Sequence, residues 1–190
     1  MKLSKRGEYA LRSMINLGIA AEVGRERVRV SELAANEQLP MKFLEQILQE
    51  LKSAGWVESH RGKFGGYRLA VPAGAIKIGQ VVRQIDGPLA PIGCVSQMAY
   101  TPCSCPDEEH CGLRMMMLDV RNAIAGILDR YTLADVVEVT TRKMKRDGVA
   151  LPFSKPARRL VTQNARKRSS TSRLSPTEGV VYQLLGEQSK

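Results

Sequence analysis

Several features that would mark common protein classes are missing from this 190-residue chain. It has no unbroken run of about 18 apolar residues, so we expect no transmembrane helix and no membrane partner. It also lacks a phosphate-binding G-x-x-x-x-G-K-[ST] loop and an apparent catalytic triad, so the sequence does not favour an enzyme. The N-terminal residues show neither a long apolar run nor a small-residue cleavage site, and we therefore expect a cytoplasmic protein.

Cysteine is absent except in one short segment. The chain has four cysteines, which are Cys94, Cys103, Cys105 and Cys111. Cytosolic thiols stay reduced, and thiolates select zinc, copper(I) or iron–sulfur clusters, so we favour a metal or redox centre over structural disulfides or inert buried thiols. Zinc is the chemical rival, although the common pair of Cys-x2-Cys units is missing. A switch in which two thiols form a disulfide is the metal-free alternative.

The net charge of +10 is spread unevenly along the chain. Residues 1–150 hold 21 basic and 17 acidic residues, whereas residues 151–190 hold 8 basic and 2 acidic ones. A basic protein favours polyanions such as nucleic acid or an anionic membrane. The final 40 residues are rich in Ser, Pro and Arg and predict a flexible basic extension, with a short helix after the capping box at 175–178.

The first 70 residues predict a helix-turn-helix followed by a hairpin. We expect helices over residues 4–21, 31–37 and 40–54, with Ser31 as the N-cap of the second. The third helix has an apolar face formed by Leu44, Ile47, Leu48 and Leu51. Residues 28–30 are expected to be extended.

Two short strands, at 56–60 and 67–69, flank a basic, glycine-rich tip. In this hairpin Arg61, Lys63 and Arg68 are placed to contact phosphates or to enter a narrow minor groove. Helix pair and hairpin together predict a winged helix-turn-helix that binds double-stranded operator DNA. A solvated basic hairpin in an ordinary α+β domain is the alternative.

Four segments in order resemble one family: residues 1–4, 43–48 (FLEQIL), 59–69 (SHRGKFGGYRL) and 78–87 (IGQVVRQIDG). Over residues 1–140 the chain resembles the Rrf2 family of winged helix-turn-helix transcription regulators, whose members include IscR, NsrR and RirA. The resemblance implies a mainly α fold with a small β wing and a long dimerisation helix. It also implies a homodimeric regulator that, like many members of the family, senses iron, nitric oxide or redox state through an iron–sulfur cluster, and we expect it to be a repressor.

The resemblance also implies roles for individual residues in DNA binding. Glu45 and Gln46 would contact bases, Arg61 would enter the minor groove, and Lys42 and Lys63 would contact phosphates. A glutamate can accept a hydrogen bond from cytosine N4, although Glu45 could equally be a solvated helix charge.

In the family the cluster loop supplies three cysteines, which the resemblance places at Cys94, Cys105 and Cys111. The interval between the first two is longer than usual here and contains the extra Cys103. The fourth ligand of a [2Fe–2S] or [4Fe–4S] cluster could be Cys103, Glu8 donated by the partner subunit, or His110. Some members place a histidine where this chain has Arg114.

We expect five regions: a winged head at 1–72, a connecting helix and loop at 73–93, the cysteine loop at 94–111, a dimerisation helix and following segment at 112–150, and the extension at 151–190. The long helix has a heptad-like seam of Leu113, Met117, Val120, Ile124, Ile127 and Tyr131. Packing of this helix inside its own domain is the alternative to a dimer.

The alternative functions are a zinc-bound or thiol-switch regulator and a redox enzyme.

Overall fold

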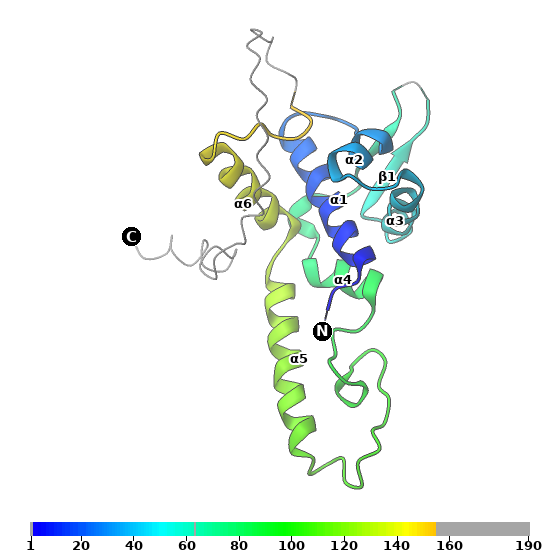
Figure 1. The fold of residues 1–190 in the computed structure, drawn as a ribbon, viewed down its shortest axis with the longest axis vertical. Coiled ribbons are helices and arrows are strands. Elements are labelled where there is room, and N and C mark those ends of the chain that lie inside the picture. Colours follow the sequence, from blue (N-terminus) through cyan, green and yellow to red (C-terminus); the bar gives the residue numbers. More distant parts are fainter. Residues whose placement is uncertain (1, 63, 155–190) are drawn as a thin grey trace.

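The computed structural model describes residues 2–62 and 64–154. A head of short helices and a hairpin lies at one end, and a stem formed by a long helix and the cysteine-containing loop extends from it (Figure 1). The elements in chain order are α1 (Lys5–Glu22), α2 (Val30–Glu37), α3 (Met41–Ser53), β1 (Val57–His60), β2 (Gly66–Leu69), η1 (Ala73–Ala75), α4 (Ile78–Asp86), η2 (Gly93–Val95), α5 (Gly112–Arg130) and α6 (Leu133–Arg146). The described part is therefore mainly helical with one two-stranded sheet.

Helix α1 is the central element of the head and packs against α3, α4 and α6. It begins where the sequence predicts, because the Ser4 hydroxyl accepts a hydrogen bond from the backbone N–H of Gly7 at 3.0 Å. The predicted apolar face of α3 is confirmed: Leu44, Ile47, Leu48 and Leu51 are all fully buried. Gln38, with φ of 55°, turns the chain between α2 and α3.

Helix α2 begins one residue before the predicted cap, so the assignment of Ser31 as N-cap is wrong. Arg29 occupies the cap position, and its backbone N–H donates to Glu32 Oε2 at 3.0 Å. A carboxylate one turn into the helix thus satisfies the first exposed donor. The backbone of Val28 is held by pairing with the hairpin, which fixes where the helix can start.

The hairpin is antiparallel, with Glu58 opposite Arg68, and it gains a third extended segment from the chain before α2. Val28 and Tyr67 exchange two backbone hydrogen bonds of 2.9 and 2.8 Å. A Cβ on Gly66 would lie 2.7 Å from the Val28 carbonyl oxygen, so this close pairing requires glycine. The predicted wing is therefore anchored to the segment that leads into the helix-turn-helix.

The stem is attached to the head through α4. Arg83 on α4 makes two hydrogen bonds to the Asp129 carboxylate on α5, at 2.6 and 2.7 Å. The segment predicted at 112–150 is two helices, because the chain turns at Thr132, whose hydroxyl accepts a hydrogen bond from the Asp135 N–H at 3.2 Å. Helix α6 then returns to pack against α1.

Two predictions fall on residues that the structure does not describe. Lys63 lies between the two described ranges, and most of the predicted basic extension, including the helix after 175–178, lies within residues 155–190. In the part of the chain that is described, every helix is too short or too polar to cross a membrane.

Candidate nucleic-acid interface and cysteine pocket

A groove of about 790 Å³ lies between α3 and the hairpin, and we call it the α3–wing groove. Met41, Glu45, Gln49 and Lys52 line it from α3, while Ser59, His60 and Arg61 line it from the hairpin. The start of α2 contributes Arg29, Val30 and Ser31. An exposed helix face beside a hairpin is the arrangement by which a winged helix-turn-helix binds the major groove with the helix and the adjacent backbone or minor groove with the wing.

The predicted DNA-binding residues do not all lie in this groove. Glu45 and Arg61 line it, whereas Lys42 and Gln46 are exposed elsewhere on α3. Arg68 Nε contacts Glu58 across the hairpin, and Arg68 Nη1 lies 3.9 Å from Glu26. The hydrogen bond from Arg68 holds the pKa of the Glu58 carboxyl below its usual value, so Arg68 acts within the wing as the partner of an ionised carboxylate.

Two further residues of α3, Gln49 and Lys52, were not among the DNA-binding residues predicted from the sequence. Both line the α3–wing groove, and Lys52 Nζ also donates to the Ser59 hydroxyl at 2.8 Å, which ties α3 to β1. Their spacing of four and seven residues after Glu45 places the three side chains on one helix face, and this signal was available in the sequence.

All four cysteines line a second cavity, of about 540 Å³, which we call the cysteine pocket. Cys94 lies in η2 and is 4% exposed, and the other three thiols are half-buried. The Cys105 and Cys111 sulfurs are 3.9 Å apart. The fold thus brings together the three cysteines that the family resemblance implied and the additional Cys103.

The pKa values of Cys94, Cys103 and Cys105 depend on neighbouring thiols. Burial raises the pKa of Cys94, and the neighbouring Cys103 raises it further. Hydrogen bonds from the Cys105 thiol and backbone lower the pKa of Cys103. Hydrogen bonding to Cys103 and then to Cys111 raises the pKa of Cys105 to about 12. Interactions therefore run from Cys94 through Cys103 and Cys105 to Cys111.

The other proposed ligands lie outside the residues that line this pocket. Glu8 is on α1, where its carboxylate pairs with Lys5 at 2.8 Å and with Arg12 at 3.4 Å. His110 is largely exposed, and its Nδ1 lies 2.7 Å from Asp107 Oδ2. The pocket wall does include Arg114, which pairs with Glu108 at 3.1 Å.

The separation of one pair of thiols, Cys105 and Cys111, fits two ligands of one metal ion. A tetrahedral metal with metal–sulfur bonds of about 2.3 Å separates two bound thiolates by about 3.8 Å, and the Cys105–Cys111 separation is 3.9 Å. Within residues 2–62 and 64–154, however, no three Cys, His, Asp or Glu side chains surround one point as a single ion requires. Each iron of a four-thiolate [2Fe–2S] cluster also binds two thiolates, so the Cys105–Cys111 pair is compatible with one iron of such a cluster as well as with zinc.

A helix-turn-helix braced by a three-segment wing, with an exposed helix face between them, defines a winged-helix DNA-binding protein. Residues 3–139 match the family model described as "Rrf2: Iron-dependent Transcriptional regulator", and the chain belongs to the Rrf2 family. It is accordingly a transcription regulator. The family resemblance and the fold class drawn from the sequence are both confirmed.

Individual relatives support the same assignment. The chain is 37% identical over 139 residues to an Rrf2-like HTH-type transcriptional regulator of Rhodobacter capsulatus, covering 71% of this chain and 91% of that one. It is 34% identical over 138 residues to NsrR of Geobacillus kaustophilus, covering 73% and 90%. The solved structure of CymR, the global cysteine regulator of Bacillus subtilis, is similar with a TM-score of 0.61 at 30% identity, covering 73% and 97%. These relatives are regulators, which confirms that the chain is not an enzyme.

Proposed function

We propose that this regulator is a homodimer that binds operator DNA and senses iron, nitric oxide or redox state through an iron–sulfur cluster in the cysteine pocket. The observation that carries the proposal is that the fold gathers all four cysteines into one cavity. Relatives named NsrR, and a family described as iron-dependent, support it. Repression is the mode of action we expect.

Cys94, Cys105 and Cys111 are the proposed ligands, with Cys103 or Glu8 of the partner subunit completing the set. A bound cluster would supply reversible one-electron chemistry and a reactive site for nitric oxide. The chain itself provides a nearly buried thiol at Cys94. Cys103 is the only one of these two alternatives within the pocket of this chain.

Coupling to DNA binding would run through the helix that precedes the cysteine loop. Asp86, the last residue of α4, accepts hydrogen bonds from the Ser4 backbone at 2.8 Å and from the Ser4 hydroxyl at 2.5 Å. The same helix is joined to α5 by Arg83 and Asp129. A change in the loop that connects α4 to α5 would therefore shift the start of α1, the central helix of the head.

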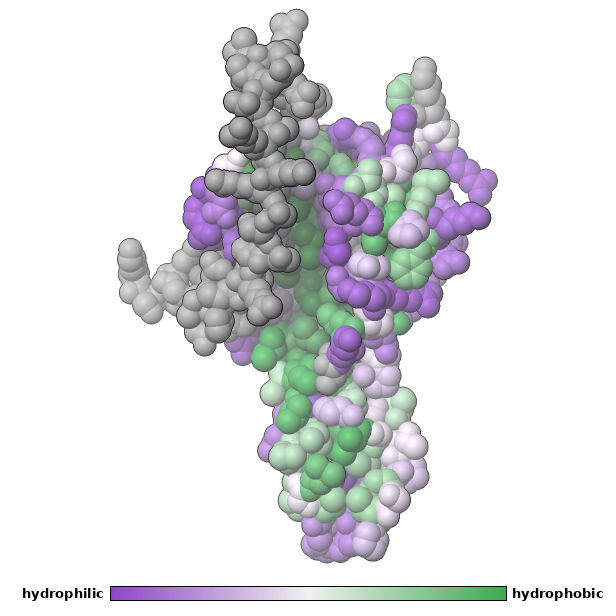
Figure 2. All heavy atoms as spheres, in the orientation of Figure 1, coloured by the Kyte–Doolittle hydropathy of each residue, from purple (hydrophilic) through white to green (hydrophobic). Residues whose placement is uncertain are grey.

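The proposed dimer contact is the exposed side of α5. Leu113, Met116, Val120 and Ile127 are between 39% and 53% exposed, and they recur along one face of the helix. Hydrophobic side chains are concentrated along this stem in Figure 2. A two-fold dimer through this face would present two winged heads to a pseudo-palindromic operator.

The test is anaerobic purification followed by optical and Mössbauer spectroscopy and by iron and sulfide analysis. We expect iron and acid-labile sulfide in equal amounts in the wild type, and their loss in Cys105→Ala. A Glu109→Ala variant, which removes an exposed charge from the same loop, should keep both. Absence of iron and sulfide after anaerobic reconstitution would contradict the assignment of a cluster. Stoichiometric zinc in the protein would assign the pocket to a zinc ion instead.

The Cys105–Cys111 separation of 3.9 Å favours a second candidate, a thiol switch. In this chemistry one thiolate attacks hydrogen peroxide and becomes a sulfenic acid with release of water or hydroxide, and the second thiol displaces its oxygen as a second water. The two sulfurs lose two electrons in total. Peroxide-dependent formation of a Cys105–Cys111 disulfide in protein without iron, detected by mass spectrometry, would support it.

A further inference from the structure

Three residues of α3 line the α3–wing groove at intervals of four residues, and these are Met41, Glu45 and Gln49. All three are exposed. Four residues are slightly more than one helical turn, so the three side chains form a stripe along one face of the helix. Helix α3 has one other glutamine, Gln46, which is exposed away from the groove. Gln49 is therefore the glutamine of α3 that lies at the groove.

The side-chain amide of Gln49 is available to a ligand. Within the described residues this amide has no hydrogen-bond partner, and only the backbone carbonyl of Gln49 is engaged by a side chain, the Ser53 hydroxyl at 3.0 Å. Three residues further on, Lys52 Nζ donates to the Ser59 hydroxyl at 2.8 Å. This bond joins α3 to β1 and fixes the helix relative to the wing next to Gln49.

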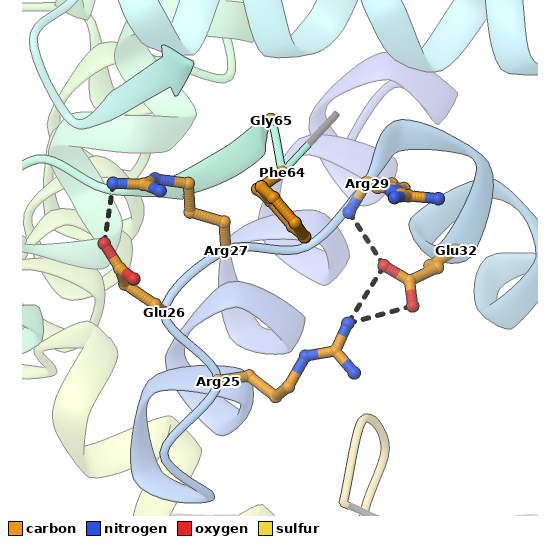
Figure 3. Close-up of a pocket in the computed structure, with 7 residues that line it drawn as sticks. All are labelled: Arg25, Glu26, Arg27, Arg29, Glu32, Phe64 and Gly65. Carbon is orange, nitrogen blue, oxygen red and sulfur yellow. Dashed lines mark hydrogen bonds and ion pairs between the residues drawn. The ribbon is translucent and has the colours of Figure 1, made fainter. Parts of the chain in front are cut away.

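The arginines of the segment before α2, which line the adjoining cavity, are already paired within the head. Arg25 pairs with Glu32 at 2.9 Å, and Arg27 pairs with Glu26 at 2.6 Å (Figure 3). A paired guanidinium gives up an ion pair when it binds a new acceptor, whereas the Gln49 amide gives up only water. Gln49 is thus better placed than these arginines to take a new hydrogen-bond partner.

The carboxamide of glutamine matches one base in the major groove. Its oxygen accepts from adenine N6 and its nitrogen donates to adenine N7, so the paired contact distinguishes adenine from the other bases. The carboxylate of Glu45 can only accept, as it would from cytosine N4. Four residues of a helix rise about 6 Å, which is less than the height of two base pairs of about 3.4 Å each. The two side chains would therefore contact base pairs no more than about two apart.

We propose that Gln49 is a specificity-determining residue that reads an adenine of the operator, within about two base pairs of the base that Glu45 contacts. The inference rests on DNA binding by the winged head and is independent of the cluster. It states the identity of one operator base and its distance from another.

The experiment selects duplexes from a random pool with wild-type protein and with Gln49→Ala, Gln49→Glu and Glu45→Gln. Gln80→Ala is the matched control, because it removes an exposed glutamine from α4, outside the groove. Dissociation constants would then be measured on the duplex that wild type selects, on duplexes with single base changes, and on an unrelated duplex.

Gln49→Ala should lose discrimination of about 5- to 150-fold in favour of adenine at one position of the selected sequence. It should keep the wild-type affinity for the unrelated duplex. Gln49→Glu should prefer cytosine at that same position, because a carboxylate accepts from cytosine N4. Glu45→Gln should change a preference for cytosine to adenine within about two base pairs of it. Gln80→Ala should select the wild-type sequence.

An unchanged base preference in Gln49→Ala would overturn the proposal. An equal loss of affinity on the selected and the unrelated duplex would assign Gln49 to the DNA backbone, and it would overturn the proposal as well. Both results would leave operator binding and the proposed sensing function intact. A wild-type protein that selects no sequence would instead refute operator binding by the winged head, and the inference with it.

Discussion

At the scale of single residues, the basic side chains of the wing differ in what they are able to contact. Arg61 is exposed and lines the α3–wing groove. Arg68 lies opposite Glu58 on the neighbouring strand and is paired with it. A guanidinium that already neutralises a carboxylate attracts a phosphate less strongly, because the two carboxylate oxygens repel the incoming anion.

We expect Arg61→Ala to weaken operator binding by about 1–3 kcal/mol, roughly 5- to 150-fold, because it removes a groove contact. Arg68→Ala should change affinity less than about twofold, as is usual for a surface substitution. Fluorescence anisotropy on a selected duplex measures both. A larger loss for Arg68→Ala than for Arg61→Ala would reverse these roles.

At Gly18, α1 lies close to α6. An added Cβ would lie 2.5 Å from Val137 Cγ2. We expect Gly18→Ala to lower the free energy of unfolding by about 1–3 kcal/mol through overpacking. Gly126→Ala, on a part of α5 where an added Cβ meets nothing within 4 Å, should raise it by about 0.5–1 kcal/mol. Urea titration checks the pair, and equal effects would contradict this account.

At the scale of elements, α5 is divided between two environments. Leu113, Val120 and Ile127 are exposed, whereas Ile124 and Tyr131 pack against the core of the same chain. The sequence assigned all of them to one seam, since their spacing places them within one face of the helix. Spacing alone does not show which of these residues pack against the head of the same chain. Packing of the helix within its own domain therefore remained an alternative to a dimer contact.

Val120→Glu should weaken self-association by about 2 kcal/mol or more, roughly thirtyfold, because it places an unpaired charge in an apolar contact. Asn122→Glu, on the opposite face of α5, should leave the dimer intact. Sedimentation velocity over a concentration series measures both dissociation constants. If the two variants behaved alike, the exposed face of α5 would not be the dimer contact.

The helices differ in how far their positions could be predicted from the sequence. Helix α3 was predictable because Leu44, Ile47, Leu48 and Leu51 repeat at the helical period. The start of α2 was not, because it depends on the pairing of Val28 with Tyr67, almost forty residues away. The local signal of Ser31 was overridden by this distant contact.

At the scale of the whole molecule, the cysteine pocket and the α3–wing groove lie in separate parts, the stem and the head (Figure 1). Helix α4 joins them, because it contacts both α1 and α5. The grouping of the cysteines could be predicted from their short spacing in the sequence. The 3.9 Å separation of the Cys105 and Cys111 sulfurs could not, since it depends on the conformation of the loop between η2 and α5.

The central claim is that the state of the cysteine pocket controls DNA binding. The most direct measurement is the dissociation constant for one selected duplex, determined anaerobically for cluster-loaded, oxidised and cluster-free protein from a single preparation. The account predicts differences of about 5- to 150-fold among these forms, the usual range for coupling between two sites. Equal affinities for all three forms would contradict it.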